Sequence, residues 1–221
     1  ATGACAVNCR YCFRREFPYA DSGATQAGIE AALGALATDT TIREVILSGG
    51  DPLLLDDERF ATLVARLEAL PHVRRLRIHS RLPIVLPARV TDALTTTLSR
   101  TRLTCVVVVH ANHPAELDAT VASAIDRLAE ARPILLNQAV LLAGVNDSVD
   151  VLAALSERLV DLGIQPYYLH LLDRVRGTAA FDIDEAAAKA LHDRLRALLP
   201  GYAVPRLARE VPGEPAKVWL G

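Results

Sequence analysis

Methionine is absent from this 221-residue chain, and lysine occurs only twice, as Lys189 and Lys217. Because the chain begins Ala-Thr-Gly and has no methionine, we expect it to be a fragment whose natural start lies upstream. No apolar run approaches the roughly 18 residues of a membrane span, and no signal-peptide pattern opens the chain. We therefore expect no membrane partner.

Clustered positive charge and a disulfide framework are also lacking. The 24 Lys and Arg residues against 26 Asp and Glu residues give a formal net charge of −2, without a basic tail or run. Nucleic acid is therefore not an expected partner, since such binding needs clustered positive charge. Cysteine occurs four times, with three residues close together, which argues for reduced thiols and a cytoplasmic location.

Short β-branched runs alternate with longer amphipathic stretches along most of the chain. The predicted strands are 44–48, 75–79, 104–110, 134–141, 166–171 and 203–208. The predicted helices, with apolar residues at helical spacing, are 25–36, 58–70, 91–99, 114–131, 149–162 and 183–199. Six repeats of strand and helix predict an α/β fold with a parallel sheet, either open or closed into a barrel, in one domain spanning 1–221.

Cys5, Cys9 and Cys12 have the spacing C-x-x-x-C-x-x-C in the segment CAVNCRYC. Three thiolates on one loop can hold three irons of a [4Fe-4S] cluster and leave the fourth iron open. A zinc knuckle or ordinary reduced thiols are the alternatives. Zinc normally takes four ligands, and the fourth cysteine, Cys105, lies in the apolar run TCVVVVH, where we expect a buried thiol.

Polar residues follow several predicted strands, at the end where α/β folds gather their binding sites. The residues after the first strand are Ser48, Gly49, Gly50 and Asp51. Two adjacent glycines let a backbone approach a ligand closely. Polar residues in or after the later strands are His79, Ser80, Arg81, His110, Asn112, His113, Asn137, Gln138, His170 and Asp173. Since buried polar groups need partners, we predict that these residues line one site.

The cysteine spacing, with the aromatic Tyr11 before the last cysteine, resembles the signature of the radical S-adenosylmethionine (SAM) enzymes. The SGGD element resembles the segment that meets the amino group of SAM in that superfamily. Longer segments resemble the lysine 2,3-aminomutases, in particular the branch associated with elongation factor P (EF-P): CRYCFRREF, ILSGGDPLL, HSRLPIVLPARVT, ANHPAEL, NQAVLLAGVND, QPYYLHLLD and EVPGEPAK.

This resemblance covers almost the whole chain and implies a partial (β/α)6 TIM-like barrel of the radical SAM type. It implies a [4Fe-4S] cluster on the three clustered cysteines, with SAM and pyridoxal 5′-phosphate (PLP) as further cofactors. The residues that we assign to cofactor binding are Tyr11, Ser48, Gly49, Gly50, Asp51, His110, Asn112, Gln138 and Lys217.

PLP is held on a lysine that must be neutral to attack an aldehyde. By resemblance this catalytic lysine is Lys217 of VPGEPAK, while Lys189 lies in a predicted helix. The resemblance also implies that Arg14 binds the α-carboxylate of an L-lysine substrate, and that Asp173 and Glu210 bind its ε-ammonium. For each acid, a helix cap or a surface salt bridge is the alternative interpretation.

The implied activity is conversion of L-lysine to β-lysine by a radical exchange, with an electron donor such as a flavodoxin or ferredoxin. A lysyl-tRNA-synthetase-like ligase would then attach the product to EF-P. No cysteine follows Cys105, so the cysteines of the structural zinc site of clostridial-type relatives are missing, which favours the EF-P branch. The alternatives are a stand-alone aminomutase of metabolism, a radical SAM enzyme without PLP, and a non-catalytic iron-sulfur or zinc module.

Overall fold

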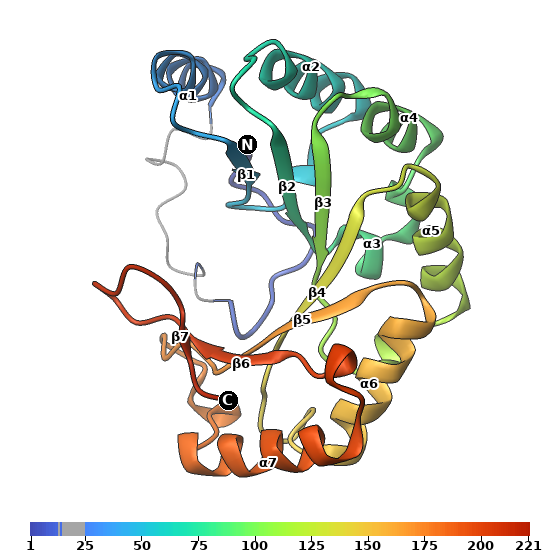
Figure 1. Cartoon of the computed structure of the whole chain (residues 1–221), viewed down its shortest axis with the longest axis vertical. Helices are drawn as coiled ribbons and strands as arrows, with labels where there is room; N and C mark the ends of the chain where they lie inside the picture. Colours follow the sequence, from blue (N-terminus) through green and yellow to red (C-terminus); the bar gives the residue numbers. More distant parts are fainter. Residues whose placement is uncertain (13, 15–24) are drawn as a thin grey trace. The chain divides into compact units, whose positions relative to one another are not determined.

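The computed structural model describes residues 1–12, 14 and 25–221, which form alternating strands and helices (Figure 1). These residues cluster into two compact units. The first comprises Ala1–Val7, 25–109 and Thr120–Leu135, and the second comprises 8–12, residue 14, His110–Ala119 and Leu136–Gly221. Nowhere in this described part does a helix combine the length and the apolar character needed to cross a membrane.

The first unit is built on parallel strands, each preceded or followed by a helix. The strands are β1 (Glu44–Leu47), β2 (Arg75–Ser80) and β3 (Thr104–Val109). The helices are α1 (Gln26–Thr38), α2 (Asp57–Glu68), α3 (Leu82–Val85), α4 (Asp92–Arg100) and α5 (Ala119–Glu130), with the 3-10 turns η2 (Pro52–Leu54) and η3 (Pro87–Arg89). Asp56 caps α2 by accepting the N–H of Arg59, as its residue type predicts.

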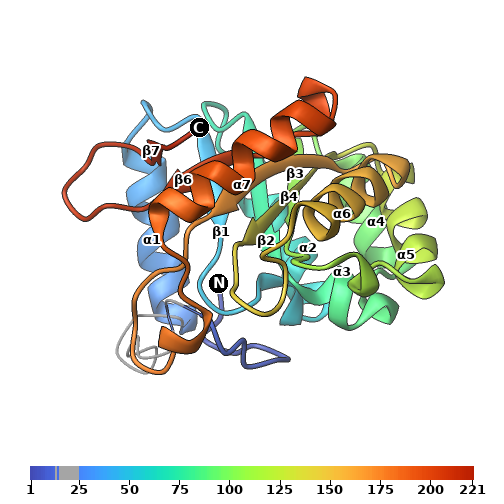
Figure 2. The same cartoon turned by 90° about the horizontal axis from the view of Figure 1, so that it is seen from below.

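The second unit continues with β4 (Ile134–Val140), which begins at the last two residues of the first unit. Its other strands are β5 (Gln165–His170) and β6 (Arg206–Arg209), parallel to their neighbours, and β7 (Val218–Trp219), antiparallel to β6. Its helices are α6 (Val149–Asp161) and α7 (Glu185–Leu198), with the 3-10 turns η4 (Pro114–Glu116), η5 (Ala179–Phe181) and η6 (Gly201–Ala203). Helix α6 contacts both β5 and α7, and Figure 2 shows the two helices along these strands.

The α/β class and the parallel strands confirm the fold prediction, with differences at the ends of elements. Strand β6 begins later than predicted because η6 and Pro205 precede it, and proline has no N–H to donate to a ladder. Helix α5 begins at Ala119 because Pro114 opens the separate turn η4. Strand β7, with two residues, was not predicted because it is too short to show an alternating pattern.

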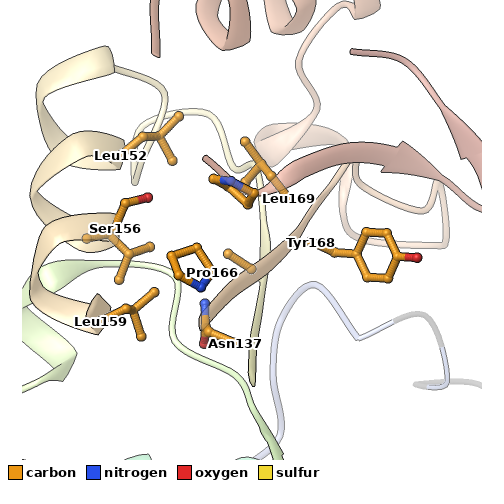
Figure 3. A pocket seen from close by; sticks show the side chains of 10 residues that line it. Asn137, Leu152, Ser156, Leu159, Pro166, Tyr168 and Leu169 are labelled. Carbon is orange, nitrogen blue, oxygen red and sulfur yellow. The ribbon is translucent and has the colours of Figure 1, made fainter. Parts of the chain in front are cut away.

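A small cavity lies between α6 and the strands β4 and β5 (Figure 3). Its volume is about 10 Å³, and its walls include Leu152, Leu159 and Pro166. This space suits about one water molecule and is far too small for a nucleotide or an amino acid. Tyr168 also lines this cavity, but its ring points away from the other lining side chains in Figure 3.

Candidate functional site

The cysteines predicted to bind a cluster belong to both units, with Cys5 in the first and Cys9 and Cys12 in the second. Cys9 and Cys12 share one turn, in which the N–H of Cys12 donates to the carbonyl of Cys9 at 3.2 Å. All three are thiols rather than disulfides and are exposed or partly buried, so their donor chemistry fits an iron-sulfur cluster. Within residues 1–12, 14 and 25–221, no three His, Cys, Asp or Glu side chains are arranged as a metal site. The ligand role of these cysteines stays a prediction.

Cys105 is buried in β3, as its apolar surroundings predicted. Burial raises the pKa of its thiol to about 11, and the negative charge of Glu68 adds to this shift. A thiol that resists deprotonation is a poor metal ligand and a poor nucleophile. Cys105 is therefore a core residue of the first unit.

The Ser48–Asp51 segment follows β1, and its glycines accommodate the start of the chain. Gly49 has a φ of 117°, which L side chains rarely adopt. The N–H of Gly50 donates to Thr2 O at 2.9 Å, and that of Asp51 donates to Ala4 O at 2.8 Å. A Cβ on Gly50 would lie 2.7 Å from the backbone nitrogen of Ala4, so a side chain there would displace this segment.

Asp51 joins the ends of β1 and β2. Its carboxylate accepts the hydroxyl of Ser80 at 2.7 Å, the N–H of Arg81 at 2.8 Å and the N–H of Leu82 at 3.2 Å. It also accepts the N–H of Leu53 at 3.1 Å, and only 7% of Asp51 is exposed. These bonds explain its burial without a ligand, and its predicted contact with a cofactor stays a prediction.

Two residues predicted to bind cofactor meet in the second unit. Asn112, which follows β3 and is buried, donates from Nδ2 to the hydroxyl of Tyr11 at 2.6 Å. Its Oδ1 accepts the N–H of Val140 at 2.8 Å. His110 lies two residues earlier, and Gln138 is a half-buried residue of β4. The cofactor contacts of these four residues stay predictions, but Asn112 has an evident structural role that sequence reasoning did not foresee.

Lys217, Glu210 and Asp173 come together in the second unit. The Lys217 ammonium forms an ion pair with the Glu210 carboxylate. Arg209 pairs with Val218 in the antiparallel β6–β7 ladder, so the next residues outward, 210 and 217, face each other. Burial raises the pKa of Asp173, and the nearby positive charge of Lys217 lowers it in part. Three residues that the family resemblance assigned to the site are thus neighbours in one unit.

A bulge in β5 adds aromatic rings to this cluster. Asn137 pairs with Pro166 but Gln138 pairs with Tyr168, so Tyr167 is an extra residue in β5. The bulge accounts for adjacent residues on one face, with the rings of Tyr167 and Tyr168 centred 4.0 Å apart. The ring of His170 is 5.2 Å from that of Tyr168, and the Lys217 ammonium is 5.6 Å from the Tyr168 ring. The sequence analysis predicted His170 as a residue lining the site, but it treated Tyr167 and Tyr168 only as strand residues.

Arg14, predicted to bind a carboxylate, is a partly buried residue of the second unit. Its neighbours at 13 and 15–24 lie outside the described residues. The carboxylate contact of Arg14 stays a prediction.

Residues 1–104 match the sequence profile of the Radical SAM superfamily. SAM-bound SuiB from Streptococcus suis resembles the chain with a TM-score of 0.69, at 14% identity over 95% of this chain and 49% of SuiB. A radical SAM methyltransferase from Sphaerobacter thermophilus gives a TM-score of 0.62, at 18% identity over 93% of this chain and 63% of that protein. At these identities the likeness concerns the fold. The match to the superfamily profile covers residues 1–104, slightly less than half of this chain.

More similar relatives are proteins named L-lysine 2,3-aminomutase. The one from Haemophilus influenzae is 50% identical over 217 residues, which cover 98% of this chain and 64% of the relative. The one from Escherichia coli is 49% identical over 218 residues, which cover 99% of this chain and 64% of the relative. The chain therefore spans slightly less than two thirds of the length of these relatives.

Proposed function

We propose that this chain is the core segment of a lysine 2,3-aminomutase, an enzyme that converts L-lysine to β-lysine with a [4Fe-4S] cluster, SAM and PLP. The observation that carries the proposal is the neighbourhood of Lys217, Glu210 and Asp173 beyond the ends of β5 and β6. The names of relatives at 50% and 49% identity support the choice of substrate.

The proposal assigns the cluster to Cys5, Cys9 and Cys12, and PLP to Lys217. When bound, the cluster and SAM supply a carbon-centred radical, and PLP makes the α-amino group able to migrate. The protein supplies binding, orientation and exclusion of water. Tyr168 is only 8% exposed and its ring lies 5.6 Å from the Lys217 ammonium, so it covers the lysine on one side, and the equally buried His170 packs beside Tyr168.

Asp173 and Glu210 suit a substrate that carries a second ammonium group. An ammonium has three donors and therefore can bond to two carboxylates at once. Without substrate, the Lys217 ammonium occupies Glu210. When the substrate ammonium binds Glu210 instead, the Lys217 ammonium loses its ion-pair partner, and the pKa of Lys217 falls. The neutral amine, which is the form that attacks an aldehyde, then becomes more populated.

The test uses the full-length protein, purified without oxygen and with its cluster reconstituted. It is incubated with dithionite, SAM, PLP and L-lysine, and β-lysine and 5′-deoxyadenosine are measured by mass spectrometry. We expect β-lysine from the wild type and none from Cys9→Ala or Lys217→Ala. Appearance of 5′-deoxyadenosine without β-lysine would contradict the substrate. Absence of both from a sample with an intact cluster would favour a non-catalytic iron-sulfur module.

Lys189→Ala is the matched control for Lys217→Ala, because these are the chain's two lysines. Lys189 is ion-paired with Glu185 within α7, four residues away, so its loss should leave β-lysine formation unchanged. Borohydride reduction of the PLP-loaded protein followed by peptide mapping should place the label on Lys217. A label on Lys189 would overturn this assignment.

We infer further that the β-lysine made by this protein serves the modification of EF-P. The motif resemblance to the EF-P branch and the lack of cysteine after Cys105 support this role. The full-length enzyme, supplied with a lysyl-tRNA-synthetase-like ligase, ATP and EF-P, should add the mass of one β-lysyl group to EF-P. Free β-lysine production without any transfer to EF-P would favour a stand-alone metabolic enzyme.

A further inference from the structure

Two chains of contacts in the second unit join the Cys9–Cys12 turn to the loop that follows β4. This loop, residues 141–146 (LLAGVN), is called here the β4 loop. One chain of contacts starts from Tyr11 and the other from Arg10, the two residues between Cys9 and Cys12. Sequence reasoning assigned neither residue a link to this loop.

The first chain of contacts runs through two buried asparagines. Tyr11 accepts from the side chain of Asn112 at 2.6 Å, as described above. The Nδ2 of Asn146 donates to the carbonyl of Asn112 at 2.8 Å and to that of Val140 at 2.9 Å. Its Oδ1 accepts the N–H of Leu142 at 2.7 Å. Asn146 is fully buried and Asn112 is 3% exposed, so these bonds are shielded from water.

The second chain of contacts runs through an aromatic ring. The Arg10 guanidinium lies 5.0 Å from the centre of the Phe181 ring in η5. The carbonyl of Phe181 accepts the N–H of Ala143, in the β4 loop, at 3.0 Å. Such a cation–π contact at a partly exposed position is weaker than the buried hydrogen bonds that link Tyr11 to Asn146 through Asn112. The Arg10–Phe181 contact therefore adds to the support of the Cys9–Cys12 turn, but it is too weak to hold the turn by itself.

We propose that Asn112 and Asn146 are positioning residues that hold the Cys9–Cys12 turn in place before a cluster is bound. Asn146 fixes the backbone of Asn112, and the Asn112 side chain fixes Tyr11, which stands between Cys9 and Cys12 in the sequence. A turn held in this way loses less conformational freedom when its thiols take up iron. The meaning of this arrangement for catalysis rests on the proposed function, while the arrangement itself is measurable without a cluster.

The first experiment measures hydrogen–deuterium exchange in the cluster-free protein. The reporter is the Cys12 amide, which is bonded to the Cys9 carbonyl. In Tyr11→Phe the ring stays and the bond to Asn112 is lost, so exchange should become about fivefold faster. Tyr202→Phe is the matched control, because Tyr202 is 63% exposed, and its exchange at Cys12 should equal that of the wild type. Wild-type exchange in Tyr11→Phe would overturn the proposal.

A pair of variants at position 112 separates positioning from general stability. In Asn112→Asp the carboxylate still accepts the Val140 N–H and can accept the Tyr11 hydroxyl proton, so slow exchange at Cys12 should be retained. Asn112→Leu removes both bonds and should give fast exchange. Equal exchange rates in Asp and Leu variants that are both folded by circular dichroism would contradict a role for this side chain.

The second experiment uses the reconstituted cluster and a spectroscopic signal. Iron loss to a chelator, followed by the visible absorbance of the cluster, should be about fivefold faster in Tyr11→Phe than in Tyr202→Phe. The electron paramagnetic resonance signal of the reduced cluster should broaden in Tyr11→Phe only. Equal rates and signals in the two variants would show that the contacts do not act on the cluster.

These readouts fail separately from the proposed function. If no β-lysine forms but Tyr11→Phe exchanges faster at Cys12, the positioning role stands and the aminomutase proposal fails. If β-lysine forms normally and exchange at Cys12 is unaffected by Tyr11→Phe, the aminomutase proposal stands and the positioning role fails.

Discussion

At the scale of single residues, burial and a nearby ammonium act in opposite directions on the pKa of Asp173. Burial raises it, the Lys217 charge lowers it, and the net pKa is above the ordinary value of 3.8. Lys217→Ala should therefore raise the Asp173 pKa further. Carboxyl titration by nuclear magnetic resonance measures this, and Lys189→Ala, which removes the lysine that pairs with Glu185, should leave the Asp173 pKa unchanged.

The raised pKa of Asp173 also predicts how stability depends on pH. A group whose pKa is higher in the folded chain contributes stability below its unfolded pKa, and this contribution is lost as pH rises through the folded pKa. Asparagine does not titrate, so Asp173→Asn removes this loss of stability at higher pH. The free energy of unfolding in urea should therefore shift in favour of Asp173→Asn as pH rises from below 3.8 to neutral. A difference between variant and wild type that stays constant with pH would contradict the environment described for Asp173.

Asp51 should matter for stability even in the absence of cofactors. Asp51→Asn replaces one carboxylate oxygen with an NH₂ group that faces N–H and O–H donors, and we expect a loss of about 1–3 kcal/mol in urea unfolding. Asp193→Asn, at a side chain that is 70% exposed, is the control and should change stability by less than about 0.5 kcal/mol. If Asp51→Asn lowers only SAM affinity and leaves stability intact, Asp51 is chiefly a ligand.

At the scale of elements, the turn after β1 depends on the missing side chain of Gly50. Gly50→Ala places a methyl group against the backbone of Ala4, so residues 1–4 should leave this turn and exchange their amides faster. Gly34→Ala is the matched control, and we expect it to increase stability. Nothing lies within 4 Å of the added methyl, and alanine in the interior of α1 should add about 1 kcal/mol of stability. A Gly50→Ala variant as stable as Gly34→Ala would contradict the close approach.

Within the elements, the strand and helix patterns located most boundaries. Ser148 caps α6 by accepting the N–H of Val151, whereas Asn146, whose residue type also favours helix starts, makes the buried contacts described above. A preference for helix starts describes only local geometry. It does not reveal that a side chain has a distant partner.

At the scale of the whole molecule, the cofactor proposal predicts ligand-dependent stability. In the full-length protein with a reconstituted cluster, SAM at 100 times its Kd should stabilise the folded state by about 2.7 kcal/mol. For a full-length protein longer than this chain, that corresponds to a rise in Tm of a few degrees, because the shift per kcal/mol falls as chain length grows. Cys9→Ala, expected to lack an intact cluster, should show a much smaller rise. Equal shifts in the two proteins would indicate that SAM binds without the cluster.

The sequence alone determined the alternation of elements and the types of chemically active residues. Strand and helix periods are local, so 44–48 and 149–162 predicted β1 and α6 closely. The spacing of Cys5, Cys9 and Cys12 and the scarcity of lysine are likewise read without a structure. The cluster-ligand assignment nevertheless stays a prediction, because spacing does not determine how three thiols are oriented.

Only the tertiary structure decided which side chains meet. Glu210 faces Lys217 because β6 and β7 pair as an antiparallel ladder, and β7 is too short to predict. The rings of Tyr167 and Tyr168 share a face because of a bulge that strand periodicity does not show. These contacts join residues through strand register and turn geometry, which depend on packing across the unit rather than on neighbouring residues in the sequence.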